Sequence, residues 1–220
     1  MNRKTPTAKK APPRRQRRNA AATREKILKA GTAEFCDKGF SGARTDAIAR
    51  RAGCNIRMIY HYFGNKRGLY LAALEKVYGD LRAKEEELDL LHLDPVSGMT
   101  ALVNFTFDYL AEHQEFIGMM TVENIQEGRH LKESKSVPTA DLPLVKSIGT
   151  LLRRGQKDGV FRKRVDPVQL YISILSLSYV HISNKHTLSI TFGERLDDKN
   201  WLARRRRHAR DVILAYLQPA

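Results

Sequence analysis

The sequence predicts an all-α protein of about nine helices, made of a small N-terminal helix-turn-helix domain and a larger helical domain. Apolar residues recur every three or four positions through most of the chain, which is the spacing of one helical face. Alternation of apolar and polar residues, which is typical of strands, is absent over any useful length, and no repeat of fixed period occurs. Cap residues, Asp-Pro pairs and glycines divide the helical pattern into segments.

Three short helices and one longer helix are expected before residue 91. The first ends at Gly39, because glycine readily takes the positive φ that follows a helix. Thr45 is expected to cap the second helix and Gly53 to end it. Asn55 can cap the third helix, and the fourth, longer helix begins near Asn65.

Five longer helices are expected in the rest of the chain. Two of them have an Asp-Pro start signal, at Asp94-Pro95 and Asp166-Pro167, since Asp caps a helix and Pro suits its first position. The helix after Asp166 is apolar on all sides, which indicates that a partner helix covers it, and we expect the last two long helices to form a dimer interface. The five ranges are 97–112, 114–126, 143–154, 166–184 and 198–217.

The composition favours a nucleic-acid partner and excludes several classes of protein. The 220 residues suffice for one large domain or two modest ones. Lys and Arg number 39 against 24 Asp and Glu, which gives a net charge of +15 and favours a polyanion or an anionic membrane surface as partner. Two cysteines exclude a disulfide scaffold and a four-cysteine zinc site. No run of 18 apolar residues occurs, so a membrane-spanning helix is not expected.

The first 20 residues predict a disordered basic arm. They hold eight basic residues and no acidic residue, and no strongly apolar side chain occurs between Met1 and Ile27. A segment with so little apolar area cannot offset the entropy lost on ordering. The arm can add phosphate contacts or reach a minor groove, and a solvated tail without a fixed partner explains it equally well. It matches neither a signal peptide nor a transit peptide.

The segment 45–66 has the pattern of a helix-turn-helix. Ala49 is small where two helices cross, Gly53 allows the positive φ of the turn, and Ile59 can lock the pair. The second helix then presents a polar outer face suited to phosphates and base edges. The alternative is an ordinary helical hairpin whose polar face is only hydrated.

A continuous stretch, 23–69, contains a specific set of residues in order: Ile27, Ala30, Phe35, Gly39-Phe40, Thr45, Ile48-Ala49, Ala52-Gly53, Ile59-Tyr60-His61-Tyr62-Phe63, Asn65-Lys66 and Leu69. This set resembles the tetracycline-repressor (TetR) family of bacterial transcription regulators. The resemblance implies a three-helix DNA-binding domain and a larger helical domain for ligand binding and dimerisation. We set these domains at 21–68 and 69–220, after the basic arm 1–20.

The resemblance also implies which residues contact DNA, and two positions depart from the usual family pattern. Cys54 stands where valine is common, and a free cysteine packs as a small apolar residue. Arg57 stands where glycine or alanine is common, and we expect it to pair with O6 and N7 of a guanine. The implied contacts are Arg44 and Thr45 near the backbone, Asn55, Ile56, Arg57 and Met58 in the major groove, Tyr60 and His61 at phosphates or bases, and Lys66 at a phosphate.

The larger domain is expected to hold an effector pocket between the ranges 97–112, 114–126 and 168–183. Most of the apolar candidates are better explained as ordinary core residues. Glu123 and Asn124 need polar partners among apolar neighbours, so they either touch a ligand or face solvent. A hydrophobic or aromatic effector would suit such a pocket. The candidates are Phe105, Tyr109, Phe116, Met119, Met120, Glu123, Asn124, Tyr179 and His181.

The predicted function is a cytoplasmic, ligand-responsive transcription regulator. We expect a homodimeric repressor that binds a palindromic operator on double-stranded DNA and is released by a small molecule. The alternative is a sequence-independent protein that compacts DNA. An enzyme is not expected, because the histidines are scattered and no nucleophile motif, phosphate loop or metal-binding His pair occurs. No cofactor, metal ion or membrane partner is predicted.

Overall fold

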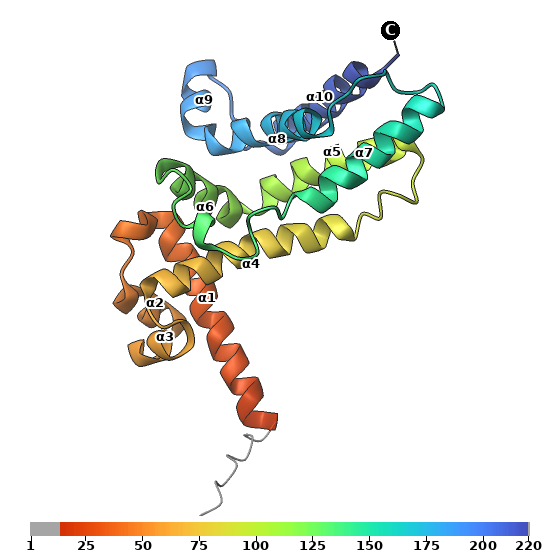
Figure 1. Cartoon of the computed structure of the whole chain (residues 1–220). Helices are drawn as coiled ribbons and strands as arrows, with labels where there is room; N and C mark the ends of the chain where they lie inside the picture. Colours follow the sequence, from red (N-terminus) through yellow and green to blue (C-terminus); the bar gives the residue numbers. More distant parts are fainter. Residues whose placement is uncertain (1–13, 220) are drawn as a thin grey trace, which may run out of the picture.

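The computed structural model describes residues 14–219, which form ten α-helices, one short 3₁₀ helix and no strand (Figure 1). The all-α prediction is therefore confirmed. The helices are α1 (Arg14–Gly42), α2 (Thr45–Ala52), α3 (Ile56–Phe63), α4 (Lys66–Glu86), α5 (Pro95–Glu112), α6 (Gln114–Ile125), η1 (Leu131–Glu133), α7 (Leu142–Lys157), α8 (Pro167–Ser183), α9 (Lys185–Phe192) and α10 (Lys199–Leu217).

Local chemistry fixes most helix ends where the sequence places them. Gly39 and Gly53 have φ values of 66° and 63°, a region that favours glycine. The side chain of Asn55 accepts a hydrogen bond from the backbone N–H of Arg57 at 2.9 Å and so caps α3. The prediction for Thr45 was wrong: it is the first residue of α2, and Arg44 stands at the cap without a capping side-chain bond.

Two helical segments differ from the prediction. Helix α1 begins at Arg14, so residues 14–20 of the predicted arm are helical, while residues 1–13 lie outside the described residues. Arg, Gln and Ala have high helix propensity, so the composition of this segment favours a helix. Helix α9 was not expected, because it buries no side chain and Ile190 and Phe192 stay exposed. Without a buried face, the sequence has no apolar period to mark a helix.

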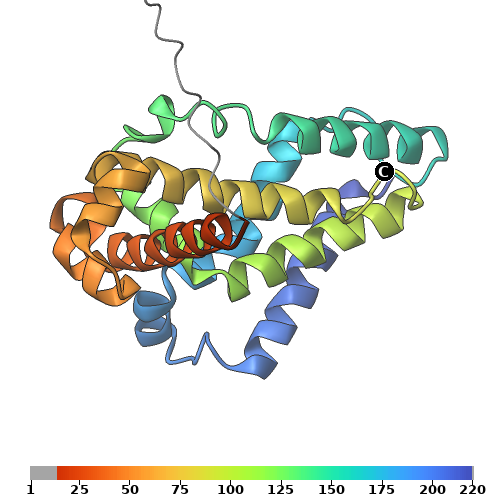
Figure 2. The ribbon, with the colours of Figure 1, turned by 90° about the horizontal axis from the view of Figure 1, so that it is seen from below.

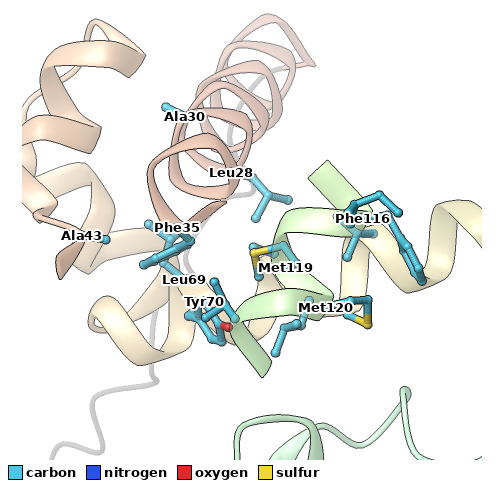
Figure 3. Packing of buried hydrophobic residues seen from close by; sticks show 14 of the residues in the cluster. Leu28, Ala30, Phe35, Ala43, Leu69, Tyr70, Phe116, Met119 and Met120 are labelled. Atoms are coloured by element: carbon cyan, nitrogen blue, oxygen red, sulfur yellow. The ribbon is translucent and has the colours of Figure 1, made fainter. Parts of the chain in front are cut away.

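The buried side chains form two cores, and the first one joins the N-terminal helices to the rest of the molecule. Ile27, Ile48, Ile59 and Leu69 have no exposed surface and hold α1–α4 together. The same core continues through Met119 of α6 (Figure 3). A second core lies between α5, α7, α8 and α10. Helix α4 runs from the N-terminal helices along the larger domain (Figures 1 and 2). None of the described helices has the length and apolarity needed to cross a bilayer.

Helices α1 and α6 approach each other closely at a glycine. A Cβ added at Gly118 of α6 would lie only 2.8 Å from Cβ and Sγ of Cys36 in α1. The Cys36 thiol donates to the backbone oxygen of Glu115 at 3.4 Å. Burial raises the pKa of Cys36 to about 11, so this thiol stays protonated at neutral pH. The contact between the two domains therefore has no space for an additional methyl group.

We predict that Gly118→Ala lowers the free energy of unfolding by about 1–3 kcal/mol, because the new methyl group overpacks the α1–α6 contact. Urea unfolding measures the change. The control is Gly79→Ala in α4, where an added Cβ meets no atom within 4 Å. That control should be neutral or stabilising by up to about 1 kcal/mol. Equal effects of the two substitutions would contradict the prediction.

Candidate DNA interface and internal cavity

Helix α3 presents a polar, exposed face on the outside of the N-terminal domain. Ile59 is fully buried and fixes the rotation of the helix. Arg57, Tyr60 and His61 lie on the opposite face, as residues spaced three and four apart do, and all three are exposed. Asn55, which caps the helix, is exposed at its start. A helix with donors on its free face and at its N-terminus is the arrangement that enters a major groove.

The other residues expected at this surface are placed differently. Ile56 and Met58 are half-buried and pack against the core, so they flank the exposed face. Thr45 is half-buried at the start of α2. Arg44 is exposed, and its Nε lies 3.2 Å from Oδ1 of Asp46.

Lys66 lies between the start of α4 and the end of α1. Its Nζ donates to the backbone oxygen of Ser41 at 3.2 Å and lies 5.0 Å from the ring centroid of Phe40. Partial burial lowers the pKa of Lys66. The ammonium group is thereby held at the N-terminus of α4, where backbone N–H groups also favour an anion.

A basic groove between α1 and α2 was not predicted. It is lined by Lys26 and Lys29 of α1 and by Arg50 and Arg51 of α2. These cations are far apart in the sequence, and only the crossing of the two helices brings them together. The groove adds positive charge to the domain that carries α3.

The larger domain contains a cavity of about 280 Å³ between α4, α5, α6 and α8. Four of the predicted pocket residues line it: Phe116, Met120, Asn124 and Tyr179. The sequence did not indicate that α4 and the residue before α7 also line this cavity. The additional polar residues in the lining are Tyr78, Arg82, Asp141, Tyr171 and Ser176.

Five predicted pocket residues are not among those that line this cavity. Phe105 and Tyr109 pack on each other with ring centroids 5.6 Å apart, and Met119 is fully buried in the core. Glu123 is buried, and its oxygens accept hydrogen bonds from Tyr70 and from the loop after α6. His181 is buried between helices α5 and α10.

A charged cluster forms one end of the cavity. Nη1 of Arg82 lies 2.6 Å from Oε2 of Glu85 and 3.0 Å from Oδ1 of Asp141. Its Nη2 donates to the hydroxyl of Tyr171 at 3.2 Å, and this hydroxyl donates to Glu85 Oε1 at 3.2 Å. Burial raises the pKa of Glu85 to about 7, while the adjacent guanidinium of Arg82 opposes that rise.

A buried carboxyl group joins α6 to the start of α4 and to the loop after α6. Glu123 of α6 is 1% exposed. Its oxygens accept from the hydroxyl of Tyr70 at 2.8 Å, from Nδ1 of His130 at 2.8 Å, and from the backbone N–H groups of His130 and Leu131, both at 3.1 Å. Burial and the bond to Glu123 raise the pKa of the Tyr70 phenol. Helix α4, helix α6 and the loop after α6 therefore meet at one side chain.

Comparison with known proteins identifies the family. The description "Tetracyclin repressor-like, C-terminal domain" matches residues 95–213, more than half of the chain, and "Bacterial regulatory proteins, tetR family" matches residues 27–73. The chain belongs to the TetR family. This TetR-family protein is therefore a DNA-binding transcription regulator, and the sequence resemblance is confirmed.

Individual relatives agree with this assignment. The HTH-type transcriptional repressor NicS of Pseudomonas putida is 36% identical to this TetR-family protein over 187 residues, or 83% of this chain and 88% of NicS. The crystal structure of the transcriptional regulator SCO4942 from Streptomyces coelicolor has a TM-score of 0.68 at 20% identity, over 89% and 98% of the two chains. The transcriptional regulator FadR from Bacillus subtilis, solved in complex with stearoyl-CoA, has a TM-score of 0.66 at 16% identity, over 88% of this chain and 99% of FadR.

We predict that His181 makes the protein less stable in mild acid. Its ring lies 4.9 Å from Phe107 and 5.6 Å from Trp201, and burial, together with the charge of Arg205, lowers the pKa of His181 from 6.5 to about 4. Between these values the unfolded chain binds a proton that the folded chain does not, so stability falls as pH falls. The expected loss is about 2 kcal/mol between pH 7 and pH 5.

Urea unfolding at the two pH values tests this assignment. His181→Phe keeps a ring against Phe107 but cannot titrate. It should therefore remove the loss of unfolding free energy that His181 causes between pH 7 and pH 5. His208→Phe, at an exposed position in the same TetR-family chain, is the control and should leave it in place. Parallel pH profiles for the parent and His181→Phe would refute the assignment.

Proposed function

We propose that this chain is a homodimeric, effector-responsive repressor that acts in the cytoplasm, binds a palindromic operator through α3 and leaves it when a small molecule binds. The observation that carries the proposal is the shared core. Helix α1, which shares one core with α2 and α3, packs directly on α6, and α6 lines the cavity of the larger domain. The packing of α1 on α6 therefore connects the domain that carries α3 with the cavity of the larger domain.

The DNA-binding part of the proposal rests on position and charge. Arg57, Tyr60 and His61 offer donors on the free face of α3, and Asn55 adds an amide at its start. Arg44 and Lys66 stand at the beginnings of α2 and α4, where they can hold phosphates. Ile56, Met58 and Thr45 are half-buried beside this face and would make apolar or backbone contacts at its edge.

The dimer is proposed on the outer faces of α8 and α10. Val168 of α8 is 45% exposed, and Val212 and Tyr216 of α10 are 40% and 48% exposed, whereas the exposed Ile172 and Val180 of α8 line the cavity. The spacing of four residues puts Val212 and Tyr216 on one side of α10. A two-fold axis through such a surface pairs identical patches and presents α3 twice, which requires an operator with two inverted half-sites.

The effector response is proposed to pass through α6. Phe116 and Met120 line the cavity, and between them Gly118 faces Cys36 of α1. Three residues after Met120, Glu123 bonds to Tyr70 at the start of α4. A ligand that binds one position of α6 more tightly than another would shift the DNA-binding domain as well. FadR from Bacillus subtilis, which shares the fold, is solved with a small-molecule ligand.

Binding to a selected operator, compared with scrambled DNA of equal length, tests the function. The protein is used to select duplexes from a random library, and its affinity for both DNAs is measured at about 0.15 M salt. A specific regulator should prefer the selected duplex by about 10³-fold or more. The net charge of +15 supports compaction of DNA as the second candidate function, and a ratio near one would favour it over repression.

We predict that Arg57→Ala weakens binding to the selected operator by about 1–3 kcal/mol and removes discrimination at one base pair, since a bidentate contact to guanine would be lost. Competition with operators changed at single base pairs measures both effects. Arg195→Ala is the matched control, because Arg195 lies in the loop before α10 with 84% of its side chain exposed. Equal weakening on all sequences would reduce Arg57 to a phosphate contact.

A further inference from the structure

Acidic side chains gather beside the cavity of the larger domain, although the net charge of the chain is +15. This cavity adjoins a second one of about 220 Å³ between α4 and α7, and Arg82 lines both. Arg82 and Asp141 are the charged residues that line the first cavity, whereas Glu85, Glu86 and Asp89 line the second. Arg82 pairs with both Glu85 and Asp141, so the single guanidinium is shared by two carboxyl groups.

Arg82 is not available for an anionic ligand. Its guanidinium already pairs with Glu85 and Asp141 and bonds to Tyr171. A ligand anion would have to displace one of these carboxylates. Displacing Glu85, which is 5% exposed, would leave a buried charge without its partner, and such a loss is strongly destabilising.

Asp141, by contrast, is available for a cation. Half of its side chain, 52%, is exposed, and Arg82 is the partner that the structure gives it. A positively charged group beside the exposed part of Asp141 would gain a favourable interaction without breaking any existing pair.

The remaining walls suit the body of a small organic cation. Tyr78, Phe116, Tyr171 and Tyr179 all contribute aromatic rings to the lining, and the face of an aromatic ring attracts a cation. A cavity of about 150 Å³ accommodates benzene, so the 280 Å³ of this cavity accommodates one ring with a short substituent. The volume of the cavity limits the size of the ligand, and its aromatic walls and Asp141 favour a positive charge on it.

We infer that the effector of this repressor is a small organic cation, such as an arylalkylamine, whose positively charged nitrogen pairs with Asp141 and whose apolar body lies against Tyr78, Phe116 and Tyr179. This inference rests on the proposed function, because it names the class of ligand for the proposed effector site. The contacts of Arg82 with Glu85 and Tyr171 stay intact in the bound state.

Three probes of equal size and different charge test the inference: 2-phenylethylammonium, 2-phenylethanol and phenylacetate. Calorimetric titration of the full chain at pH 7 measures their affinities. The ammonium probe should bind about tenfold more tightly than the alcohol, and phenylacetate should bind most weakly. Asp141→Asn should lower the affinity for the ammonium probe about tenfold and leave that for the alcohol within about twofold.

A matched variant shows whether the loss of affinity depends on Asp141 itself or on the removal of any carboxylate from α7. Asp158→Asn removes a carboxylate at the other end of α7, and it should leave the affinity for every probe unchanged. The Asp141 side chain makes no capping bond to α7, so Asp141→Asn should fold normally, as circular dichroism would show.

Two results would overturn the inference. Tightest binding of phenylacetate, strengthened by Asp141→Asn, would mean that Arg82 recognises an anion. Equal binding or no binding of the three probes would exclude a single-ring cation. Operator binding is measured on the same samples: if it stays specific, only the ligand class is rejected, and if it is lost, the proposed function fails.

Discussion

The carboxyl group of Glu123 is the constraint on which the position of α6 against α4 depends. A charged group that is 1% exposed must be fully hydrogen-bonded, because an unpaired charge in the interior is costly. Tyr70 and the 130–131 backbone supply those bonds, from α4 and from the loop after α6. The start of α4, the end of α6 and this loop therefore cannot move independently without breaking a bond to the same side chain.

The constraint extends to the DNA-binding surface through ring packing. The centroid of the His130 ring, which bonds to Glu123, lies 4.5 Å from that of the Phe40 ring. The ammonium group of Lys66 lies 5.0 Å from the centroid of the same Phe40 ring. Lys66 begins α4 only three residues after the end of α3. A displacement of α6 would thus reach both Lys66 and α3, the proposed phosphate contact and the proposed reading helix, which gives the proposed release from DNA a physical path.

Local features were predictable from the sequence, and features that depend on tertiary contacts were not. Asn55 and Gly53 act within their own turns, so their roles follow from residue type alone. Glu123 was expected to meet ligand or solvent, but its partners come from 53 residues earlier and from the following loop, which no spacing rule reveals. The charged end of the cavity was missed for the same reason, since Arg82 and Asp141 come from separate segments of the chain.

The charged cluster at the end of the cavity is difficult to explain by stability alone. A buried ion pair rarely stabilises a protein more than apolar residues of similar size would, because desolvation cancels much of the attraction. Arg82 and Glu85 sit in α4 where leucines could complete the core, and Arg82 has to serve both Glu85 and the half-exposed Asp141 at a cavity wall. The proposed selective binding of a cation would explain this cost, because a carboxylate beside aromatic rings distinguishes a cation from a neutral molecule of the same shape.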